Sequence, residues 1–119
     1  MGGTVLIVDD HAAFRSAATA VLQADGFTVV GEAADGADAI AAATRLKPRI
    51  VVLDVQLPDC DGFEVAERLA ARGASSVIVL TSSRSITSFR RRLAANPSWN
   101  FIPKSELSGE ALRAVLADR

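Results

Sequence analysis

The sequence has little of several features that would assign it to a class of protein. Its single cysteine, Cys60, excludes an internal disulfide and a zinc site built from thiolates. Thirteen basic residues oppose fourteen acidic ones, so the chain has a net charge of −1 and lacks the basic excess that binds nucleic acid. No apolar run approaches the ~20 residues that cross a membrane, and no basic segment precedes the first apolar run, so a signal peptide is not expected. We therefore expect a cytoplasmic protein that binds neither nucleic acid nor membranes directly.

What the chain does contain is typical of one folded domain. Its 119 residues suit a single domain of ordinary size. Half of them are apolar and 23% are charged, which argues against disorder. The sequence shows no linker and no internal repeat, so we expect residues 1–119 to form one domain, with no output domain in this chain.

Short apolar runs alternate with alanine-rich segments of helical periodicity. The predicted strands are 5–8, 27–30, 50–53, 77–80 and 99–102. The predicted helices are 12–24, 36–46, 62–72, 86–95 and a last helix with Ser108 as its N-cap. Strands that are apolar throughout are buried on both faces, so this order predicts an α/β fold in which helices cover both sides of a parallel sheet.

Polar side chains follow four of the five predicted strands. Asp9 and Asp10 come directly after the first strand and Asp54 after the third. Thr81 follows the fourth strand and Lys104 comes soon after the fifth. Open parallel sheets bind their ligands outside the carboxyl ends of the strands, so we expect these side chains to share one site.

Three carboxylates at one site need either a raised pKa or a cation. Two carboxylates ~4 Å apart repel each other by about 4 kcal/mol at an effective dielectric constant near 20. Mg²⁺ is bound by carboxylates, waters and phosphate oxygens, and a lysine and a hydroxyl beside it complete a phosphate site. Lys104 is one of only two lysines in the chain. No separate nucleophile follows these strands, and a carboxylate can serve as one by forming an aspartyl-phosphate.

These residues resemble the receiver domain of bacterial two-component response regulators, and the resemblance covers essentially the whole chain. The matching features are the pair Asp9-Asp10, Asp54 with Pro58 and Gly62 after it, Thr81 and Lys104. Residues 9–11, 30–33 and 101–107 are most similar to the branch that carries a C-terminal helix-turn-helix DNA-binding domain. The resemblance implies a (βα)5, doubly wound, flavodoxin-like three-layer sandwich with strand order 2-1-3-4-5.

The resemblance also implies a role for each residue of the site. Asp54 would be the phosphoacceptor that takes a phosphoryl group from a histidine kinase. Asp10, Asp54 and the backbone carbonyl of Gln56 would hold Mg²⁺, with Asp9 assisting through water. The domain would promote its own phosphorylation and dephosphorylation and would not act as an enzyme on a separate substrate.

Two further residues would convert phosphorylation into a signal. Thr81 and Lys104 would bind the phosphoryl oxygens, and Phe101 occupies the aromatic position that swings inward when Thr81 moves. The surface of the fourth helix, fifth strand and fifth helix would then change, and dimerisation on phosphorylation is expected. The whole protein is expected to regulate transcription.

Three departures from the family pattern bear on this expectation. The stretch 96–100 reads Asn-Pro-Ser-Trp-Asn where relatives are glycine- and alanine-rich, which affects the length and mobility of the fourth helix. Ser105 replaces a common proline, so the usual cis peptide after Lys104 is not expected. Ser82 stands where alanine or glycine is common, a change that should still admit phosphate.

Two other functions remain open at this point. A haloacid-dehalogenase-type phosphatase also uses an aspartate nucleophile, but it needs a second acid two residues later, where this chain has Gln56 after Asp54. A receiver-like domain that binds a partner without being phosphorylated is the other. The complete set of acids, threonine and lysine argues against it. His11 is expected at the surface or just behind the residues of the site, since a lone histidine makes no metal site. Arg90, Arg91 and Arg92 are expected on a solvated helix face, with a patch that binds a partner as the alternative.

Overall fold

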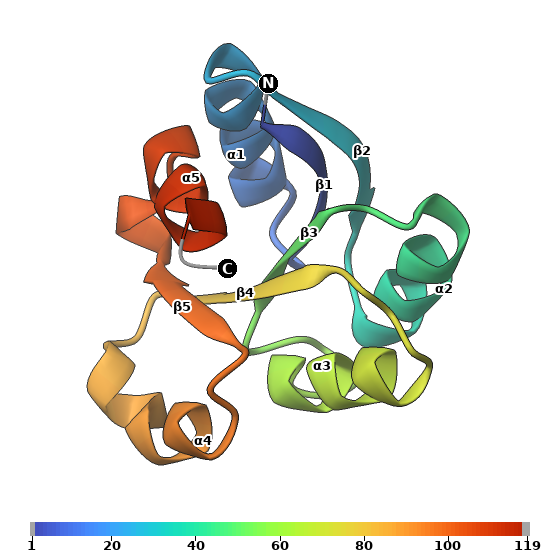
Figure 1. Ribbon diagram of the computed structural model, residues 1–119, viewed down its shortest axis with the longest axis vertical. Helices are drawn as coiled ribbons and strands as arrows, with labels where there is room; N and C mark the ends of the chain where they lie inside the picture. The colour runs from blue at the N-terminus through green and yellow to red at the C-terminus, as the bar shows by residue number, and fades with distance from the viewer. Residues whose placement is uncertain (1, 118–119) are drawn as a thin grey trace.

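A computed structural model describes residues 2–117 of the chain (Figure 1). The strands are β1 (Gly3–Val8), β2 (Phe27–Ala33), β3 (Ile50–Asp54), β4 (Val77–Ser82) and β5 (Asn100–Pro103). The α-helices are α1 (Ala12–Ala24), α2 (Gly36–Leu46), α3 (Gly62–Ala71), α4 (Arg90–Ala95) and α5 (Gly109–Ala117). Two short 3-10 helices, η1 (Ile86–Phe89) and η2 (Lys104–Glu106), precede α4 and α5.

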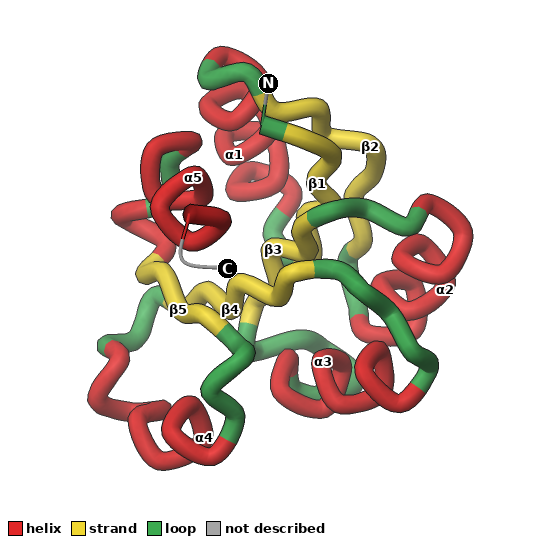
Figure 2. Tube along the Cα trace, in the orientation of Figure 1, coloured by secondary structure: helices red, strands yellow, loops and turns green. Residues whose placement is uncertain are grey.

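The five strands form one parallel sheet in the order β2-β1-β3-β4-β5 (Figure 2). The chain therefore folds as the expected flavodoxin-like α/β sandwich. Strand order reverses between β1 and β3, so the carboxyl ends of these two strands flank the position where ligands of this architecture bind. No helix in the described part of the chain is long and apolar enough to span a bilayer.

The sheet separates two hydrophobic cores. In β1, the side chains of Val5 and Ile7 belong to the core beneath α1 and α5, whereas Leu6 and Val8 belong to the core beneath α2, α3 and α4. This alternation follows from the two-residue period of a strand. All five residues of β3 are buried, so its apolar run is covered on both faces. The two cores fix the sheet, and thereby the strand ends that carry the polar residues.

Side-chain caps begin three of the helices. Asp35 accepts a hydrogen bond from the backbone N–H of Asp38 in α2, and Asp61 accepts one from Glu64 in α3. The hydroxyl of Ser108 accepts from the N–H of Ala111, as predicted for the last helix.

The predicted helix 86–95 is wrong as one continuous helix. It is divided into η1 and α4, and α4 has only six residues. Ile86, Thr87 and Ser88 are poor helix formers, because branched side chains and hydroxyls that compete for backbone hydrogen bonds both disfavour the helix. Strand β5 begins one residue later than predicted, at Asn100. The described residues contain no cis peptide bond, in agreement with the expectation for Ser105.

Candidate functional site

The predicted polar residues meet at the carboxyl edge of the sheet. Asp54 is the last residue of β3 and pairs in register with Thr81 of β4. Asp9 directly follows β1, and its backbone N–H donates to the carbonyl of Ala33 at the end of β2. Lys104 follows β5 directly. Asp9 and Thr81 are completely buried and Asp54 is 3% exposed, so these polar groups sit in the protein rather than at its surface.

The ammonium group of Lys104 holds two of the carboxylates. Its Nζ lies 2.6 Å from Oδ2 of Asp9 and 3.1 Å from Oδ2 of Asp54. The same Nζ lies 4.8 Å from the centre of the Phe14 ring of α1, within the range of a cation–π interaction. The Lys104 side chain is 18% exposed. It therefore reaches from the end of β5 to the tips of β1 and β3 and stays accessible to a ligand there.

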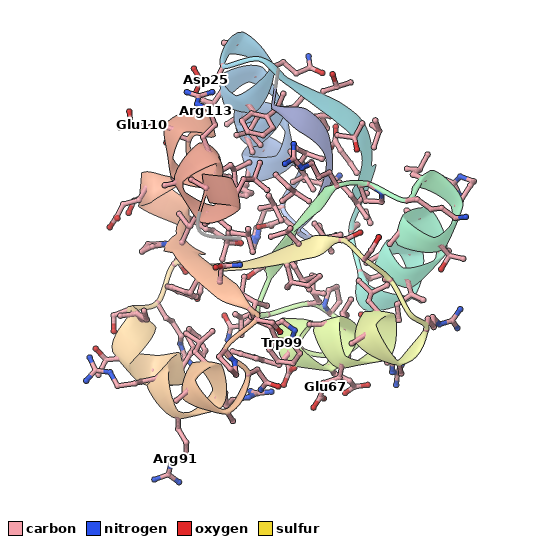
Figure 3. The ribbon with its side chains drawn as sticks, viewed as in Figure 1. Asp25, Glu67, Arg91, Trp99, Glu110 and Arg113 are labelled. Atoms are coloured by element: carbon pink, nitrogen blue, oxygen red, sulfur yellow. The ribbon has the colours of Figure 1, made fainter. Side chains whose placement is uncertain are left out.

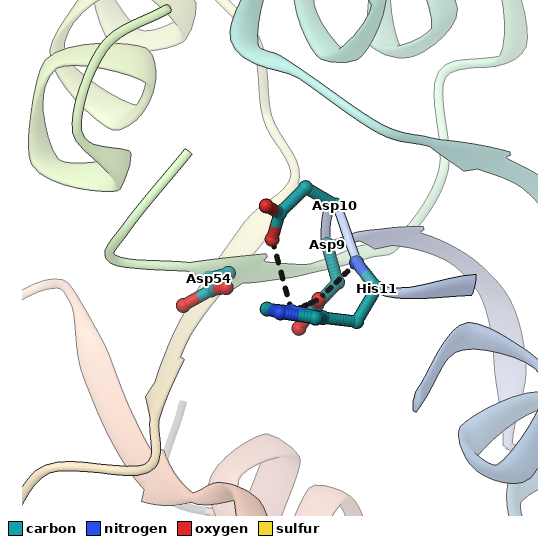
Figure 4. Close-up of side chains that lie close together, drawn as sticks. All are labelled: Asp9, Asp10, His11 and Asp54. Atoms are coloured by element: carbon teal, nitrogen blue, oxygen red, sulfur yellow. Dashed lines mark hydrogen bonds and ion pairs between the residues drawn. The ribbon is translucent and has the colours of Figure 1, made fainter. Parts of the chain in front are cut away.

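The acidic cluster carries more negative charge than Lys104 can balance. One ligand atom from each of Asp9, Asp10, His11 and Asp54 lies within 4.8 Å of all the others (Figure 4). Carboxylates at that separation or closer repel each other by at least about 3 kcal/mol at an effective dielectric constant near 20. Three carboxylates and one ammonium leave a net charge of −2. An oxygen-rich site with this charge fits a divalent cation such as Mg²⁺.

The pKa values of the central residues reflect this crowding. Burial raises the pKa of Asp54, and the charge of Asp9 raises it further, against the opposing effects of the Gln56 N–H and Lys104. Burial acts to lower the pKa of Lys104, but its contacts with Asp9 and Asp54 outweigh burial and raise it. Lys104 therefore stays charged, and Asp54 is a carboxylate that is stabilised by additional positive charge.

The loop after Asp54 is folded tightly against it. The N–H of Gln56 donates to Oδ1 of Asp54 at 3.1 Å, and the N–H of Gly62 donates to the carbonyl of Val55 at 2.7 Å. A Cβ atom on Gly62 would collide with the carbonyl oxygen of Asp54, so only glycine allows this approach. Glycine at this position thus fixes the loop that carries Gln56.

Thr81 has a feature that points to an absent partner. Its hydroxyl oxygen is buried and has no hydrogen-bond partner among the described residues. A buried unpaired hydroxyl costs about 1–3 kcal/mol. Thr81 lies beside Asp54, so an oxygen atom of a group bound at Asp54 would be a suitable hydrogen-bond partner for this hydroxyl.

An aromatic cluster lies beside β4 and β5. Phe101 is half-buried, and its ring centre is 5.7 Å from that of Phe89 in η1. Phe63 of α3 contacts both Phe89, at 5.9 Å, and Trp99, at 6.0 Å. The cluster joins α3, the segment of η1 and α4, and the fifth strand.

Three residues contribute contacts that the sequence interpretation did not identify. Arg15 of α1 donates from Nη1 to the carbonyl of Asp9 at 2.6 Å and from Nε to Glu32 at 2.9 Å, which fixes the backbone of the acidic pair. His11 is exposed, as expected, and its ring also lies within the acidic cluster. No periodicity signals these contacts, because each depends on a side-chain direction.

Arg92 is the third residue; it is exposed, as predicted for a solvated helix face, but its side chain also contacts α3. Its guanidinium carbon lies 4.0 Å from the centre of the Phe63 ring, and Nη2 lies 3.0 Å from Oδ2 of Asp61. Arg91, in contrast, extends outward from α4 (Figure 3). Arg92 therefore ties α4 to the beginning of α3.

A family comparison identifies the class to which this site belongs. The model of the response regulator receiver domain matches residues 5–116. The chain belongs to the response regulator receiver family. Receiver domains of two-component systems bind Mg²⁺ at an acidic pocket, and this chain has an acidic cluster of Asp9, Asp10 and Asp54.

Individual relatives agree with this assignment. The chain is 36% identical over 113 residues to a protein of Pseudomonas aeruginosa named for transcription regulation, covering 95% of this chain and 55% of that protein. It is 33% identical over 117 residues to the virulence-factor transcription regulator BvgA of Bordetella pertussis, covering 98% and 56%. The chain therefore spans about half the length of these relatives.

A solved structure gives the same result for the fold. The signal receiver domain of the response regulator NarL from Mycobacterium tuberculosis superposes with a TM-score of 0.84 at 28% identity, covering 98% of this chain and 94% of that one. The sequence-based family assignment and the fold prediction are both confirmed.

Proposed function

We propose that this receiver domain is a signalling switch in which Asp54 accepts a phosphoryl group from the phosphohistidine of a sensor histidine kinase. The observation that carries the proposal is the convergence of Asp9, Asp10 and Asp54 with Lys104 at the ends of three strands. In the reaction, an oxygen of Asp54 forms a bond to phosphorus as the P–N bond of phosphohistidine breaks. The departing imidazole takes up a proton.

The chain's own residues supply most of what this transfer needs. Oδ1 of Asp54 is oriented by the Gln56 N–H, and Oδ2 faces the ammonium of Lys104. We assign the binding of the phosphoryl oxygens to Lys104 and to the hydroxyl of Thr81, which lacks a partner in the described structure. Thr81 pairs in register with Asp54 and Lys104 contacts its carboxylate, so the two groups would supply a hydrogen bond and charge where negative charge accumulates.

Asp10, Asp54 and the carbonyl of Gln56 would hold Mg²⁺, with Asp9 contacting it through water. The donor set fits this ion, because it is made of oxygen atoms and carries a net charge of −2 with Lys104 included. When bound, Mg²⁺ neutralises charge on the phosphoryl oxygens and on Asp54.

The proposed switch runs from Thr81 through the aromatic cluster. Moving a two-state element from about 1:99 to 99:1 requires ~5.5 kcal/mol. Two hydrogen bonds from Thr81 and Lys104 to a charged phosphoryl group, at about 1.5–3 kcal/mol each, approach that amount. Movement of Thr81 would vacate space for Phe101, which packs on Phe89 of η1. The surface of α4, β5 and α5 would change as a result, and dimerisation through it is part of the proposal.

The relatives support a role for the whole protein in transcription. Both relatives described above are named as regulators of transcription, and this chain matches about half of each. We propose that the receiver domain regulates an output domain of that kind, and that it does so in the cytoplasm, without contacting DNA itself.

The proposal is tested by incubating the protein with Mg²⁺ and acetyl phosphate and measuring its intact mass. We expect a phosphate-sized increase that is lost in Asp54→Ala and on addition of EDTA. Asp38, an exposed acid in the first turn of α2, offers a matched control, and Asp38→Ala should be phosphorylated normally. Normal phosphorylation of Asp54→Ala would refute the assignment. Sustained hydrolysis of an aryl phosphate would favour a phosphatase instead.

A further inference from the structure

A cavity lies at the edge of the sheet opposite to the acidic cluster. Helices α2 and α3 lie side by side on one face of the sheet (Figure 1). Both end at the amino edge of the sheet, because each returns the chain to the start of the next parallel strand. The cavity has a volume of about 590 Å³ and lies between these helix ends and the segment 73–76. Small-molecule sites have volumes of about 300–1,000 Å³, so a small organic molecule fits.

The walls of the cavity combine apolar side chains with two cations. Ala43 and Leu69 line the cavity and are otherwise buried, at 6% and 2% exposure. Lys47 directly follows α2 and Arg72 directly follows α3, and both also line the cavity. No acidic residue of the described chain is among the lining residues. The cavity therefore offers an apolar surface and positive charge to the same ligand.

The two cations have no anionic partner of their own. Within the described part of the chain, neither the ammonium of Lys47 nor the guanidinium of Arg72 forms an ion pair or a hydrogen bond. Arg68, which lies one turn earlier on α3, is in contrast paired with Glu64. Ser75 also lines the cavity and forms no hydrogen bond with the described residues. These groups are therefore available to a ligand.

The ends of the two helices account for only part of the positive charge. A helix C-terminus carries about half a negative charge, so a cation beside it is favourable. The two ends together contribute about −1, whereas Lys47 and Arg72 contribute two positive charges. The charge that is left over is about +1, which a ligand with a single negative charge would neutralise.

We propose that this cavity binds a small organic monoanion, whose carboxylate lies between Lys47 and Arg72 and whose apolar part packs against Ala43 and Leu69. Arg72 suits a carboxylate because a guanidinium can donate two parallel hydrogen bonds to it. The cavity lies at the other edge of the sheet from Asp54 and is separate from the acidic cluster, which repels anions. The proposal therefore does not depend on phosphorylation of Asp54.

The first test compares two small probes that differ in charge. The first is 1-naphthoate, a monoanion with an apolar ring system, and its matched control is 1-naphthylmethanol, which has the same rings and no charge. In protein labelled with ¹⁵N, we expect naphthoate to shift the backbone amide signals of residues 69–76 and to leave those of residues 54–58 unchanged. The alcohol should bind about tenfold more weakly. Naphthoate shifts confined to other parts of the chain, or no shifts at millimolar concentration, would overturn the proposal.

Substitutions of exposed residues separate the charge of the cavity from its shape. The double variant Lys47→Gln/Arg72→Gln should weaken naphthoate binding roughly tenfold, because each exposed cation contributes a factor of about three, and should leave binding of the alcohol unchanged. Ser75→Trp, which places a large side chain at the cavity, should weaken binding of both probes. Arg91→Gln alters an arginine that extends outward from α4 and should retain both affinities (Figure 3). Undiminished naphthoate affinity in the double variant, or an equal loss in Arg91→Gln, would overturn the proposal.

Discussion

Removing the ammonium of Lys104 should destabilise the fold, and the loss should depend on Asp54. At an effective dielectric constant near 20, the contacts of Nζ with Asp9 at 2.6 Å and with Asp54 at 3.1 Å correspond to gross attractions of about 6 and 5 kcal/mol. Burying the charges cancels most of this. Breaking a buried pair by deleting one partner nevertheless costs about 3–5 kcal/mol, because the other charge stays buried. We expect Lys104→Met to lower the free energy of unfolding by that amount.

Asp54→Asn should act in the opposite direction. Burial and the repulsion from Asp9 raise the pKa of Asp54 in the folded state, so its ionised form opposes folding at neutral pH. We expect this variant to be more stable than the unaltered protein at neutral pH. In the Asp54→Asn background, Lys104→Met should cost about 2 kcal/mol less than in the unaltered protein, since only one buried carboxylate then loses its partner.

Urea denaturation followed by circular dichroism, at neutral pH and without divalent ions, gives the free energy of unfolding of each protein. The four proteins compared are the unaltered protein, Lys104→Met, Asp54→Asn and the double variant. The control is Lys47→Met, which changes the chain's other lysine, an exposed residue at the end of α2, and should have little effect. If the effects of Lys104→Met and Asp54→Asn on the free energy of unfolding are additive, Lys104 does not compensate the charge of Asp54. Our description of the site's electrostatics would then be incorrect.

Three further substitutions test other parts of the structure. Arg92→Ala should destabilise the protein by about 1 kcal/mol through loss of its ring contact and an exposed ion pair, and should speed hydrogen exchange in α4, whereas Arg91→Ala should do neither. Gly62→Ala should cost about 1–3 kcal/mol in urea denaturation, because its Cβ collides with the carbonyl of Asp54; an unchanged midpoint would contradict this. Asp59→Asn should lower the thermal midpoint at pH 6. Backbone N–H groups at the start of α2 lower the pKa of Asp59 below the ordinary 3.8, so its contribution is present above 3.8 and is lost as pH falls through the folded value. If the thermal midpoints of Asp59→Asn and the unaltered protein still differ below that pH, the ionised carboxylate of Asp59 is not the cause of the difference.

The sequence predicted the sheet and the meeting of polar residues at its edge, because both depend on short, strong patterns. Continuous apolar runs identify buried parallel strands, and the residue after such a strand must lie at the edge of the sheet. Asp54 and Thr81 are therefore neighbours by topology alone, once the strand order is known. Helix α2 was predicted with both ends correct, because Asp35 caps one end and Pro48 follows the other.

The remaining features depend on side-chain directions and on weak local preferences. The segment 86–95 has helical periodicity, but its first residues resist an α-helix, and the short α4 that results is anchored to α3 by Arg92. Likewise, the sequence places His11 beside the acids without showing whether its ring turns toward them. Only the three-dimensional arrangement reveals that Nδ1 lies within 3.1 Å of two carboxylates.

The most direct test of the central claim is to locate the phosphoryl group chemically. The protein is phosphorylated with acetyl phosphate and Mg²⁺, treated with borohydride, which reduces an aspartyl-phosphate to homoserine, and analysed by peptide mass spectrometry. We predict homoserine at position 54, with none at positions 9 and 10. Reduction at either of those positions, or an unmodified position 54 in protein that carries phosphate, would contradict the assignment of Asp54 as the phosphoacceptor.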